Sequence, residues 1–301
     1  MKEKEIFIFG STGQLGGELI EARATRSQWK VRPWSHEEID VTDSVALKNA
    51  IGVSRPWAVV NCTAYNQVDA AQNEPEKAFA VNAAAVASLA GICRCLNIYL
   101  VHFGTDFVFD GKSSRPYREE DPAIPLNIYG LSKLAGEQAL RILHPRHCII
   151  RTCGLYGPHR SRNSKRNFVD AILSQAQQNT PIQVRNDLIL SPTYAPELAE
   201  ATCQLMEREA LGTFHAANTG QCSWHEFARE ILRQKNLRRE VAPISGPAIS
   251  NTVPRPPYAV LDISKLNRLG IRSMSSWQDA LAAYLAGQEK GSAHGNKQSV
   301  S

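Results

Sequence analysis

Tyr129 and Lys133 stand four residues apart in the segment Asn127–Leu143, whose pattern predicts a helix. The i, i+4 spacing places both side chains on one helix face. A free tyrosine has a pKa of about 10, and a neighbouring ammonium group lowers that pKa by stabilising the phenolate. Such a tyrosine can donate a proton to a carbonyl oxygen during hydride reduction. An isolated Tyr-x-x-x-Lys is also common on surface helices, so the surrounding elements decide its meaning.

Thr105 is the third residue that fits this chemistry. It follows the apolar run Ile98–Phe103, which predicts a buried strand, and it precedes Asp106. Active sites of open α/β sheets lie beyond the carboxyl ends of the strands. The Thr105 hydroxyl is therefore placed to orient the carbonyl oxygen that a tyrosine protonates.

A glycine-rich turn near the N-terminus predicts dinucleotide binding. Gly10, Gly13 and Gly16 follow the apolar run Glu5–Phe9 and open the helical segment Leu15–Ala24. Gly10 allows a tight turn, Gly13 lets the backbone approach a pyrophosphate, and Gly16 lets the helix pack closely. The helix N-terminus then presents unpaired N–H groups to the phosphates. The spacing is GxxGxxG rather than GxGxxG, but its place directly after a strand favours a cofactor site over an ordinary turn.

The end of the second strand indicates which cofactor is used. An acid at this point would bind the ribose 2′-hydroxyl, but the sequence reads Pro33 to His36 and has no acid before Glu37. With Arg32 nearby, this pattern favours NADPH and leaves NADH open. Asp40 and Val41 are expected to lie under the adenine, and the alternative for Asp40 is a helix-capping role.

Strand and helix signals alternate over the first two-thirds of the chain. Apolar runs at 5–9, 57–62, 98–103 and 147–152 are separated by helical segments. This order predicts an α/β fold with a Rossmann-type, doubly wound parallel sheet. The run Trp29–Trp34 is a weak strand candidate because it contains Pro33.

The alternation weakens after residue 155, which predicts a smaller mixed α/β substrate lobe. We expect an NAD(P)-binding Rossmann domain over 1–155 and a substrate-binding lobe over 156–287, from which some segments return to the first domain. The polar stretch 288–301 is expected to be a disordered tail.

Composition excludes several classes of protein. Of 301 residues, 43% are hydrophobic and 21% are charged, which is enough to bury a core. A net charge of +5 is too weak for a nucleic-acid-binding surface. No run approaches 18 apolar residues, which excludes a transmembrane helix, and the N-terminal apolar stretch is too short for a signal peptide, so no membrane partner is expected. Seven cysteines without metal or redox spacing indicate reduced, mostly buried thiols in the cytoplasm.

Several motifs are specific when they occur together. They are Phe9–Gly16, Val60–Tyr65, Gly104–Gly111, Pro125–Gly130 and Ser132–Glu137, with weaker matches as far as about residue 270. In this combination the chain resembles the dTDP-4-dehydrorhamnose reductase family of extended short-chain dehydrogenases/reductases. The resemblance implies NAD(P)H-dependent reduction of the 4-keto group of a nucleotide-activated deoxysugar, foremost dTDP-4-dehydro-L-rhamnose to dTDP-L-rhamnose.

The same resemblance implies roles for individual residues. Tyr129, Lys133 and Thr105 would form the catalytic set, with Tyr129 as the proton donor. Thr105 and Asp106 would contact the sugar. Asn167 and Arg255 are further substrate candidates, and Arg255 in the proline-rich loop either contacts a substrate phosphate or is an ordinary surface arginine. Cofactor contacts would come from Gly10, Thr12, Gly13, Gln14, Leu15, Gly16, Asp40, Val41, Ala64, Tyr65, Asn66, Tyr129 and Lys133.

Two departures from the family pattern affect the expected sugar pocket. The family's Ser-Thr-Asp-Tyr reads Gly104-Thr-Asp-Phe107, and its Arg-Thr-Ser-Trp reads Arg151-Thr-Cys-Gly154. The second change removes a large stacking surface. One alternative is therefore a reductase of a different 4-keto sugar nucleotide. Another is a non-catalytic regulatory subunit, because the methionine adenosyltransferase β subunit resembles the same family and keeps a Tyr/Lys pair.

Metal binding and assembly are left open. Some family members hold Mg²⁺ at a Glu-lined dimer interface, and Glu18 fits one such position, whereas Pro196 with adjacent Glu197 occupies the second. No metal is assigned, Mg²⁺ stays open, and so does a homodimer. Trp224 is expected to pack in the core. The basic loop Ser161–Arg166 is either a solvated loop or a diphosphate contact.

Overall fold

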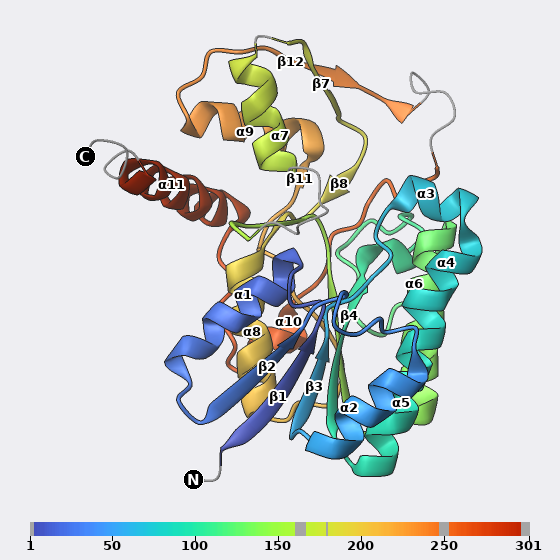
Figure 1. The fold of residues 1–301 in the computed structure, drawn as a ribbon. Coiled ribbons are helices and arrows are strands. Elements are labelled where there is room, and N and C mark those ends of the chain that lie inside the picture. The colour runs from blue at the N-terminus through green and yellow to red at the C-terminus, as the bar shows by residue number, and fades with distance from the viewer. Residues whose placement is uncertain (1–2, 160–166, 179, 247–252, 296–301) are drawn as a thin grey trace.

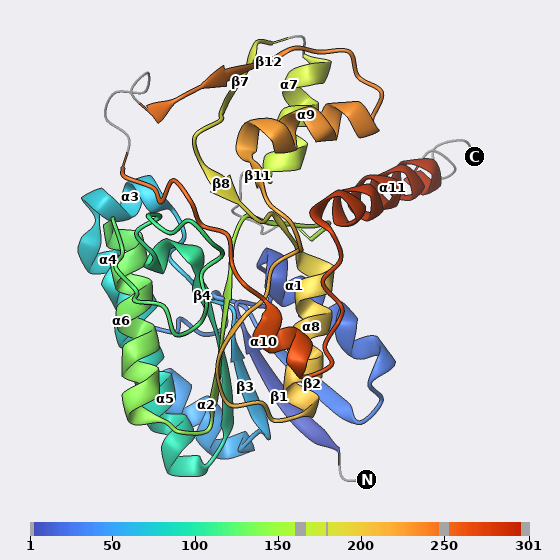
Figure 2. The same ribbon diagram turned by 180° about the vertical axis from the view of Figure 1, so that it is seen from behind.

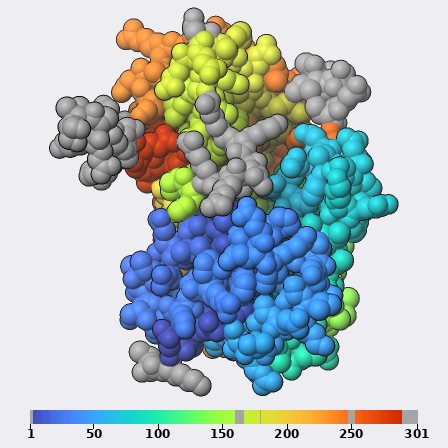
Figure 3. Space-filling view, viewed as in Figure 1, coloured from blue at the N-terminus to red at the C-terminus, as the bar shows by residue number. Residues whose placement is uncertain are grey.

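The computed structural model describes residues 3–159, 167–178, 180–246 and 253–295. A sheet with helices on both faces forms one body, and a smaller lobe lies beyond the carboxyl ends of its strands (Figure 1). The space-filling view shows the yellow-green and orange lobe above the blue surface of the N-terminal segment (Figure 3). The loop Ser161–Arg166 lies outside the described residues, so both of its interpretations stay predictions.

Six strands form one parallel sheet in the order β10-β5-β4-β3-β1-β2. Alternate side chains of a strand face opposite sides, so Ile6 and Ile8 enter one core cluster and Phe7 and Phe9 enter the other. The strands of this sheet are β1 (Lys4–Phe9), β2 (Trp29–Trp34), β3 (Ala58–Asn61), β4 (Tyr99–Thr105), β5 (His147–Thr152) and β10 (Gly212–His215).

The strand β2 forms although it contains Pro33, which the sequence interpretation counted against it. It lies at the edge of the sheet and pairs only with β1, where Pro33 stands opposite Ile8. An edge strand forms ladder hydrogen bonds on one side only, so a residue without an N–H is tolerated there.

Helices cover both faces of the sheet, as expected for a doubly wound fold. The two views agree that α1 and α8 lie side by side on one face, with α10 near them, and that α2, α5 and α6 lie on the other (Figures 1 and 2). Their bounds are α1 (Gln14–Ala22), η1 (Arg23–Thr25), α2 (Ser44–Ser54), α3 (Val68–Asn73), α4 (Pro75–Phe79), η2 (Ala80–Ala84), α5 (Ala85–Leu96), η3 (Asp106–Val108), α6 (Ile128–Leu143), α8 (Ala195–Glu207) and α10 (Ser264–Arg268).

The elements α4, η2 and α5 form one continuous helical run, in which η2 is a π turn. With a mean hydropathy of 1.7 over its most apolar window, Pro75–Leu96 is long and apolar enough to cross a membrane by length and composition. Asn82 and Arg94 interrupt the apolar residues of this segment, so the absence of a long apolar run was not sufficient to exclude a helix of this kind. Val86, Leu89 and Cys93 on this run pack in the core cluster that includes Phe7 and Phe9. The run therefore covers the sheet as a core helix.

The smaller lobe is built from short paired strands and helices around an aromatic core. In it β7 pairs with β12, and β8 pairs with β11. Tyr156, Ile172, Phe227 and Trp277 are buried together there. The elements after residue 155 that lie outside the large sheet are β6 (Leu155–Tyr156), α7 (Phe168–Gln177), β7 (Ile182–Arg185), β8 (Ile189–Leu190), β9 (Thr193–Tyr194), β11 (Cys222–Ser223), α9 (Trp224–Gln234), β12 (Val241–Ile244) and α11 (Trp277–Gly295).

The chain returns to the sheet after it enters the second lobe. The strand β10 extends the sheet beside β5, and α8 packs on α1. Both segments follow residue 155 and return to the first domain, as the sequence analysis allowed for some segments of the second lobe.

The tail expected from residue 288 is wrong in its starting point. The helix α11 continues to Gly295, and the Gln288 amide donates to Asp170 Oδ1 at 2.8 Å. This contact with another helix anchors the polar turns that composition alone assigned to a tail. Residues 296–301 lie outside the described part of the chain.

Candidate active site

The glycine-rich turn forms a cradle at the carboxyl end of β1. Gly10 has a φ of +76°, and the N–H groups of Gly10 and Ser11 both donate to the Trp34 carbonyl oxygen, at 3.0 and 3.2 Å. A Cβ on Gly16 would overlap the carbonyl oxygen of Gly10. Gly13 is the N-cap of α1, and within the described part of the chain no side-chain hydrogen bond caps this end of the helix. The N–H groups of Gly10 and Ser11 are thereby used within the turn, and it is the first turn of α1, after Gly13, that offers backbone N–H groups to an anion such as a dinucleotide diphosphate.

Neighbours of this cradle divide into exposed and buried groups. Thr12 is exposed, and the Gln14 amide reaches the Gly157 carbonyl oxygen at 3.4 Å. Leu15 instead packs in the core cluster on the α1 face of the sheet. Its side chain is therefore committed to packing, and a cofactor contact from Leu15 would come from its backbone.

Asp40 and Val41 are held by local structure. The Asp40 carboxylate accepts from the Thr42 N–H at 2.9 Å and from the Thr42 hydroxyl at 2.8 Å. These hydrogen bonds lower the pKa of Asp40. Val41 is 5% exposed and belongs to the core cluster on the other face. The turn brings backbone and the Asp40 carboxylate to the surface, while the Val41 side chain supports it from below.

A carboxylate that the sequence interpretation missed lies at the end of β2. Glu38 Oε2 accepts from the Ser35 N–H at 2.7 Å, and the Ser35 hydroxyl accepts from the Glu38 N–H at 3.3 Å. The Arg32 guanidinium lies 4.3 Å from the centre of the Trp34 ring. Both charge signs are thus present where a ribose 2′ substituent is recognised in such folds.

The segment that contains Ala64, Tyr65 and Asn66 is clamped by Asn82. The Tyr65 N–H donates to Asn82 Oδ1 at 2.9 Å, and Asn82 Nδ2 donates to the Tyr65 carbonyl oxygen and the Ser132 hydroxyl, each at 3.0 Å. Asn82 is fully buried. It therefore ties this loop to the helix that carries Tyr129 and Lys133. In the sequence, the feature that could have indicated this role is the position of Asn82 as a polar residue within a largely apolar helix.

The helix α6 begins at a capped turn directly before the catalytic candidates. Asn127 Oδ1 accepts from the Gly130 N–H at 2.8 Å, and this cap fixes the register of the helix. Lys133 is 2% exposed, and its ammonium donates to the Phe103 carbonyl oxygen at 2.6 Å. Burial lowers the pKa of Lys133 to about 8. The Thr105 hydroxyl donates to Asp106 Oδ1 at 3.0 Å.

The pKa of Tyr129 moves in the opposite direction from the sequence prediction. Burial raises this pKa to about 12, although a hydrogen bond with the Thr105 side chain acts against the rise. The predicted depression by Lys133 is wrong, because desolvation of the phenolate dominates and the Lys133 ammonium is bonded to a backbone carbonyl instead. The Tyr129 ring also meets Phe107 edge-to-face, with 5.5 Å between ring centres.

A cavity of about 490 Å³ opens between the sheet edge and the second lobe. Asp106 lines it, and burial raises the pKa of Asp106 to about 7. Trp224 is half-buried and also lines the cavity, so its assignment to core packing is incomplete. The described lining is mostly apolar and contains a few polar groups. It includes the apolar residues Phe107, Gly154, Phe168, Leu190 and Trp224 and the charged residues Asp106 and Arg255.

The two other predicted substrate residues behave differently. Arg255 lines the cavity, and its Nη2 donates to both Asp69 oxygens at 2.9 Å. Asn167 caps α7 by accepting from the Asp170 N–H, and its amide donates to Gly157 and Tyr284. The described lining of the cavity does not include Asn167. The structure thus brings Arg255 to the cavity and uses Asn167 to fasten the second lobe.

A buried ion pair holds α6 against β5 behind the site. Arg151 Nη2 lies 2.7 Å from Glu137 Oε2, and the two side chains are 2% and 0% exposed. A Cβ on Gly104 would overlap Glu137 Oε1. In this chain the pair occupies the space that a serine at position 104 would need.

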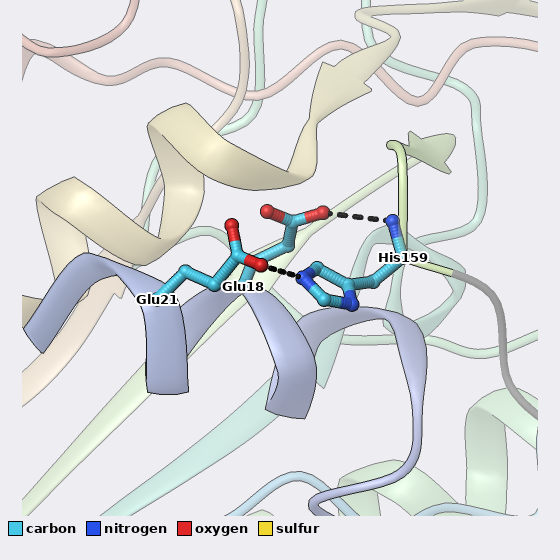
Figure 4. A group of neighbouring side chains, drawn as sticks. All are labelled: Glu18, Glu21 and His159. Carbon is cyan, nitrogen blue, oxygen red and sulfur yellow. Dashed lines mark hydrogen bonds and ion pairs between the residues drawn. The ribbon is translucent and has the colours of Figure 1, made fainter. Parts of the chain in front are cut away.

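Glu18, Glu21 and His159 form a cluster at the surface of α1 (Figure 4). Glu18 accepts from the backbone N–H of His159 at 3.1 Å, and His159 Nε2 lies 2.8 Å from Glu21 Oε1. Glu197 is used elsewhere, since it accepts from Asn218 at 2.6 Å and from the Ser275 hydroxyl at 2.7 Å. One ligand atom from each of the three lies within 4.8 Å of the others, a spacing that could hold a metal ion, and Mg²⁺ dependence stays open.

Comparison with known proteins places this site in a family. Residues 4–289 match the family model described as RmlD substrate binding domain. The chain is 35% identical over 289 residues to the spore coat polysaccharide biosynthesis protein SpsK of Bacillus subtilis, covering 96% of this chain and 99% of that protein. It is 34% identical over 281 residues to dTDP-4-dehydrorhamnose reductase of Streptomyces griseus, covering 91% and 90%.

A solved structure gives the same relationship. The crystal structure of dTDP-4-dehydrorhamnose reductase from Bacillus anthracis in complex with NADP matches with a TM-score of 0.89 and 32% identity, covering 95% of this chain and 99% of that one. The family model and these relatives each span nearly the whole chain, and the fold resemblance extends over both the sheet and the second lobe. The chain therefore belongs to the dTDP-4-dehydrorhamnose reductase family and is an NAD(P)H-dependent oxidoreductase.

Proposed function

We propose that this protein reduces the 4-keto group of dTDP-4-dehydro-L-rhamnose to give dTDP-L-rhamnose. The observation that carries the proposal is the arrangement of Thr105 and Tyr129 at the carboxyl edge of the sheet, next to the cavity lined by Asp106 and Phe107. The names of the relatives support reduction of a 4-keto sugar nucleotide.

The glycine cradle would hold the nicotinamide cofactor, which would supply the hydride. The residues present fit such a group, because Gly10 and Gly16 leave no room for side chains and the N-terminus of α1 faces the cradle. Asn82 keeps the loop around Tyr65 in place beside it. Lys133 carries its charge below a pKa of about 8 and would hold the nicotinamide ribose.

Tyr129 donates the proton that the reduced carbonyl oxygen requires. Its pKa of about 12 keeps the phenol protonated at neutral pH, so the acid form is available before each turnover. The Thr105 hydroxyl orients the carbonyl oxygen toward the phenol. Asp106 accepts from Thr105 and would contact the sugar, while Arg255 would contact the diphosphate.

We propose NADPH as the preferred cofactor. The guanidinium of Arg32, stacked on Trp34, is the group that would neutralise a 2′-phosphate. The Glu38 carboxylate next to Ser35 works against that charge. Measured kcat/KM values for NADPH and NADH test the proposal. Arg32→Ala is expected to reduce the ratio of kcat/KM for NADPH to kcat/KM for NADH. A ratio below one in the unmodified protein would contradict the preference for NADPH.

A different 4-keto sugar nucleotide is the second candidate, favoured by Phe107 and Gly154 in the cavity wall. A panel of nucleotide 4-ketosugars, each with NADPH, distinguishes the two. The rhamnose precursor is expected to give the highest kcat/KM. Turnover of another sugar with a higher value would select the alternative, and absence of turnover with the whole panel would overturn both.

The same panel tests the regulatory-subunit alternative. A stable complex with an enzyme partner from the source cell, together with absence of reductase turnover, would support that reading.

We also propose a cytoplasmic location, which the free state of all seven cysteines supports. Sedimentation of the purified protein decides between a monomer and the homodimer that the resemblance left open.

A further inference from the structure

Gly154 lies beside the cavity, and its neighbours occupy the place that a side chain there would take. Gly154 follows β5 and has a φ of +51°, a left-handed conformation. A Cβ built there would lie 3.5 Å from Cη2 of Trp224 and 2.7 Å from Cδ1 of Leu190. All three residues line the cavity. The edge of the Trp224 indole therefore borders the space toward which a side chain at position 154 would project.

Trp224 is held in place by the structure around it. It is the first residue of α9, whose start is fixed by a reciprocal capping box between Ser223 and Glu226. The preceding β11 pairs with β8. Its ring packs on Phe168 with 4.5 Å between ring centres, and on Phe227 at 6.2 Å. A capped helix start and two aromatic neighbours give the indole little freedom, so the wall is formed before a ligand arrives.

The same cavity contains the groups next to the reaction centre. Asp106 accepts from Thr105, and Phe107 contacts the Tyr129 ring. A sugar whose carbonyl oxygen reaches Tyr129 would therefore have Phe107 near it, with the apolar wall of Trp224, Phe168 and Leu190 also lining the cavity. A deoxysugar presents a methyl group and an apolar ring face, which gain most from contact with an aromatic surface.

We propose that Trp224 is the sugar-contacting aromatic residue of this protein. It supplies, from the second lobe, the stacking surface that Gly154 lacks, and the pair formed by Gly154 and Trp224 sets which 4-keto sugars fit. This inference rests on the proposed function, because it concerns the sugar part of the same substrate.

The test compares ligands that differ only in the sugar. Binding of dTDP-L-rhamnose and of dTDP is measured by titration calorimetry for the full-length protein with saturating NADP⁺. Trp224→Ala is expected to weaken dTDP-L-rhamnose binding on the order of tenfold, while dTDP affinity changes less than about twofold. Equal weakening of both ligands would assign Trp224 to the base or the phosphates and overturn the inference. So would unchanged binding of both.

Two further variants serve as a fallback and as a control for the comparison of dTDP-L-rhamnose with dTDP. Trp224→Phe keeps an aromatic ring against Phe168 and Phe227, so it remains informative if the alanine variant does not fold, and it is expected to retain most of the sugar affinity. Larger losses for dTDP than for dTDP-L-rhamnose in this variant would contradict the inference. Trp277→Phe is the matched control, because Trp277 packs on Phe227 but lies outside the described lining of the cavity. It is expected to leave both affinities unchanged.

The effect of a side chain at position 154 is tested by substituting Gly154. Asparagine tolerates a left-handed backbone, so Gly154→Asn adds a side chain beside Trp224 with little backbone strain. We expect a higher KM for the sugar nucleotide and an unchanged Kd for NADPH, and an unchanged KM would contradict the role of the pair. If the unmodified protein binds neither dTDP-L-rhamnose nor another nucleotide sugar, the proposed function fails. If it binds them and Trp224→Ala binds equally well, only this inference fails.

Discussion

The sheet body and the second lobe contribute to the cavity in different ways. The sheet body lines it with Asp106 and Phe107 and holds Thr105, Tyr129 and Lys133 close by, on the end of one strand and one turn of the adjoining helix, where caps and buried hydrogen bonds fix them. The second lobe contributes Trp224 and Phe168 from separate helices that pack on each other. Regular backbone thus sets the chemistry, and side-chain packing between distant segments sets the shape of the sugar pocket.

This difference predicts where changes will act. Substitutions in the sheet body should abolish turnover, cofactor binding or folding. Substitutions at the lobe side of the cavity should change affinity for the sugar nucleotide and leave hydride chemistry intact. A sheet-body variant that altered only sugar affinity would break the division.

The largest expected effect is at the proton donor. Tyr129→Phe removes the phenol and should lower kcat by about a hundredfold to ten-thousandfold, with little change in substrate affinity. Steady-state kinetics and calorimetry on the same preparation measure both quantities. Tyr258→Phe is the control, since its hydroxyl bonds Gln221 in the second lobe, and it should keep full turnover. An active Tyr129→Phe enzyme would contradict the assignment.

The second effect is on the stability of the sheet body. Glu137→Gln leaves the buried Arg151 guanidinium without its carboxylate, and removing one member of a buried pair costs about 3–5 kcal/mol of unfolding free energy. Glu230→Gln breaks a pair in the second lobe whose Arg233 partner is 71% exposed, so its loss of unfolding free energy should be much smaller than that of Glu137→Gln. Urea titrations measure both values. Equal losses would contradict the contrast between the two regions.

The third effect concerns the cradle. Gly16→Ala forces a methyl group onto the Gly10 carbonyl oxygen, and such overpacking costs about 1–3 kcal/mol. Because the turn must shift to relieve the overlap, NADPH affinity should fall by more than the stability loss explains. Gly52→Ala is the matched control, since a Cβ there meets no described atom within 4 Å. Unchanged NADPH affinity in Gly16→Ala would argue against the cradle as the diphosphate site.

The fourth effect is a pH dependence from Lys133. Its pKa of about 8 means that the ammonium form dominates below that pH and is lost as the pH rises through it. NADPH affinity should therefore decline above pH 8, by up to about tenfold per pH unit where this charge controls binding. Lys133→Arg should move the decline to higher pH, because arginine keeps its charge. A decline at the same pH in this variant would assign it to another group.

The smallest effect is expected at the cavity mouth. Asp69→Asn weakens the hold on the Arg255 guanidinium, so the KM for the sugar nucleotide should change by a few-fold or less, as for an exposed ion pair, while kcat stays constant. Asp69→Glu should restore the value. A large fall in kcat would show that this contact belongs with the catalytic groups of the sheet body.

The sequence was more informative about the positions of Tyr129, Lys133 and Thr105 than about the cavity wall, and their catalytic roles stay predictions. Tyr129, Lys133 and Thr105 could be placed because helix periodicity and strand ends follow from local patterns. The direction of the Tyr129 pKa could not be predicted, since it depends on burial that only the folded chain creates. Trp224 was assigned to the core because its position on the cavity depends on residues seventy positions away, around Gly154.

By itself, the sequence determined the doubly wound fold, the glycine turn and the helix with Tyr129 and Lys133, because these depend on hydrophobic period, glycine placement and short-range hydrogen bonds. Only the tertiary structure decided that Pro33 sits in an edge strand, that β10 returns to the sheet, that Asn82 clamps the loop around Tyr65 and that Arg255 is paired with Asp69. Each of these depends on contacts between segments far apart in the chain, which local residue patterns do not encode.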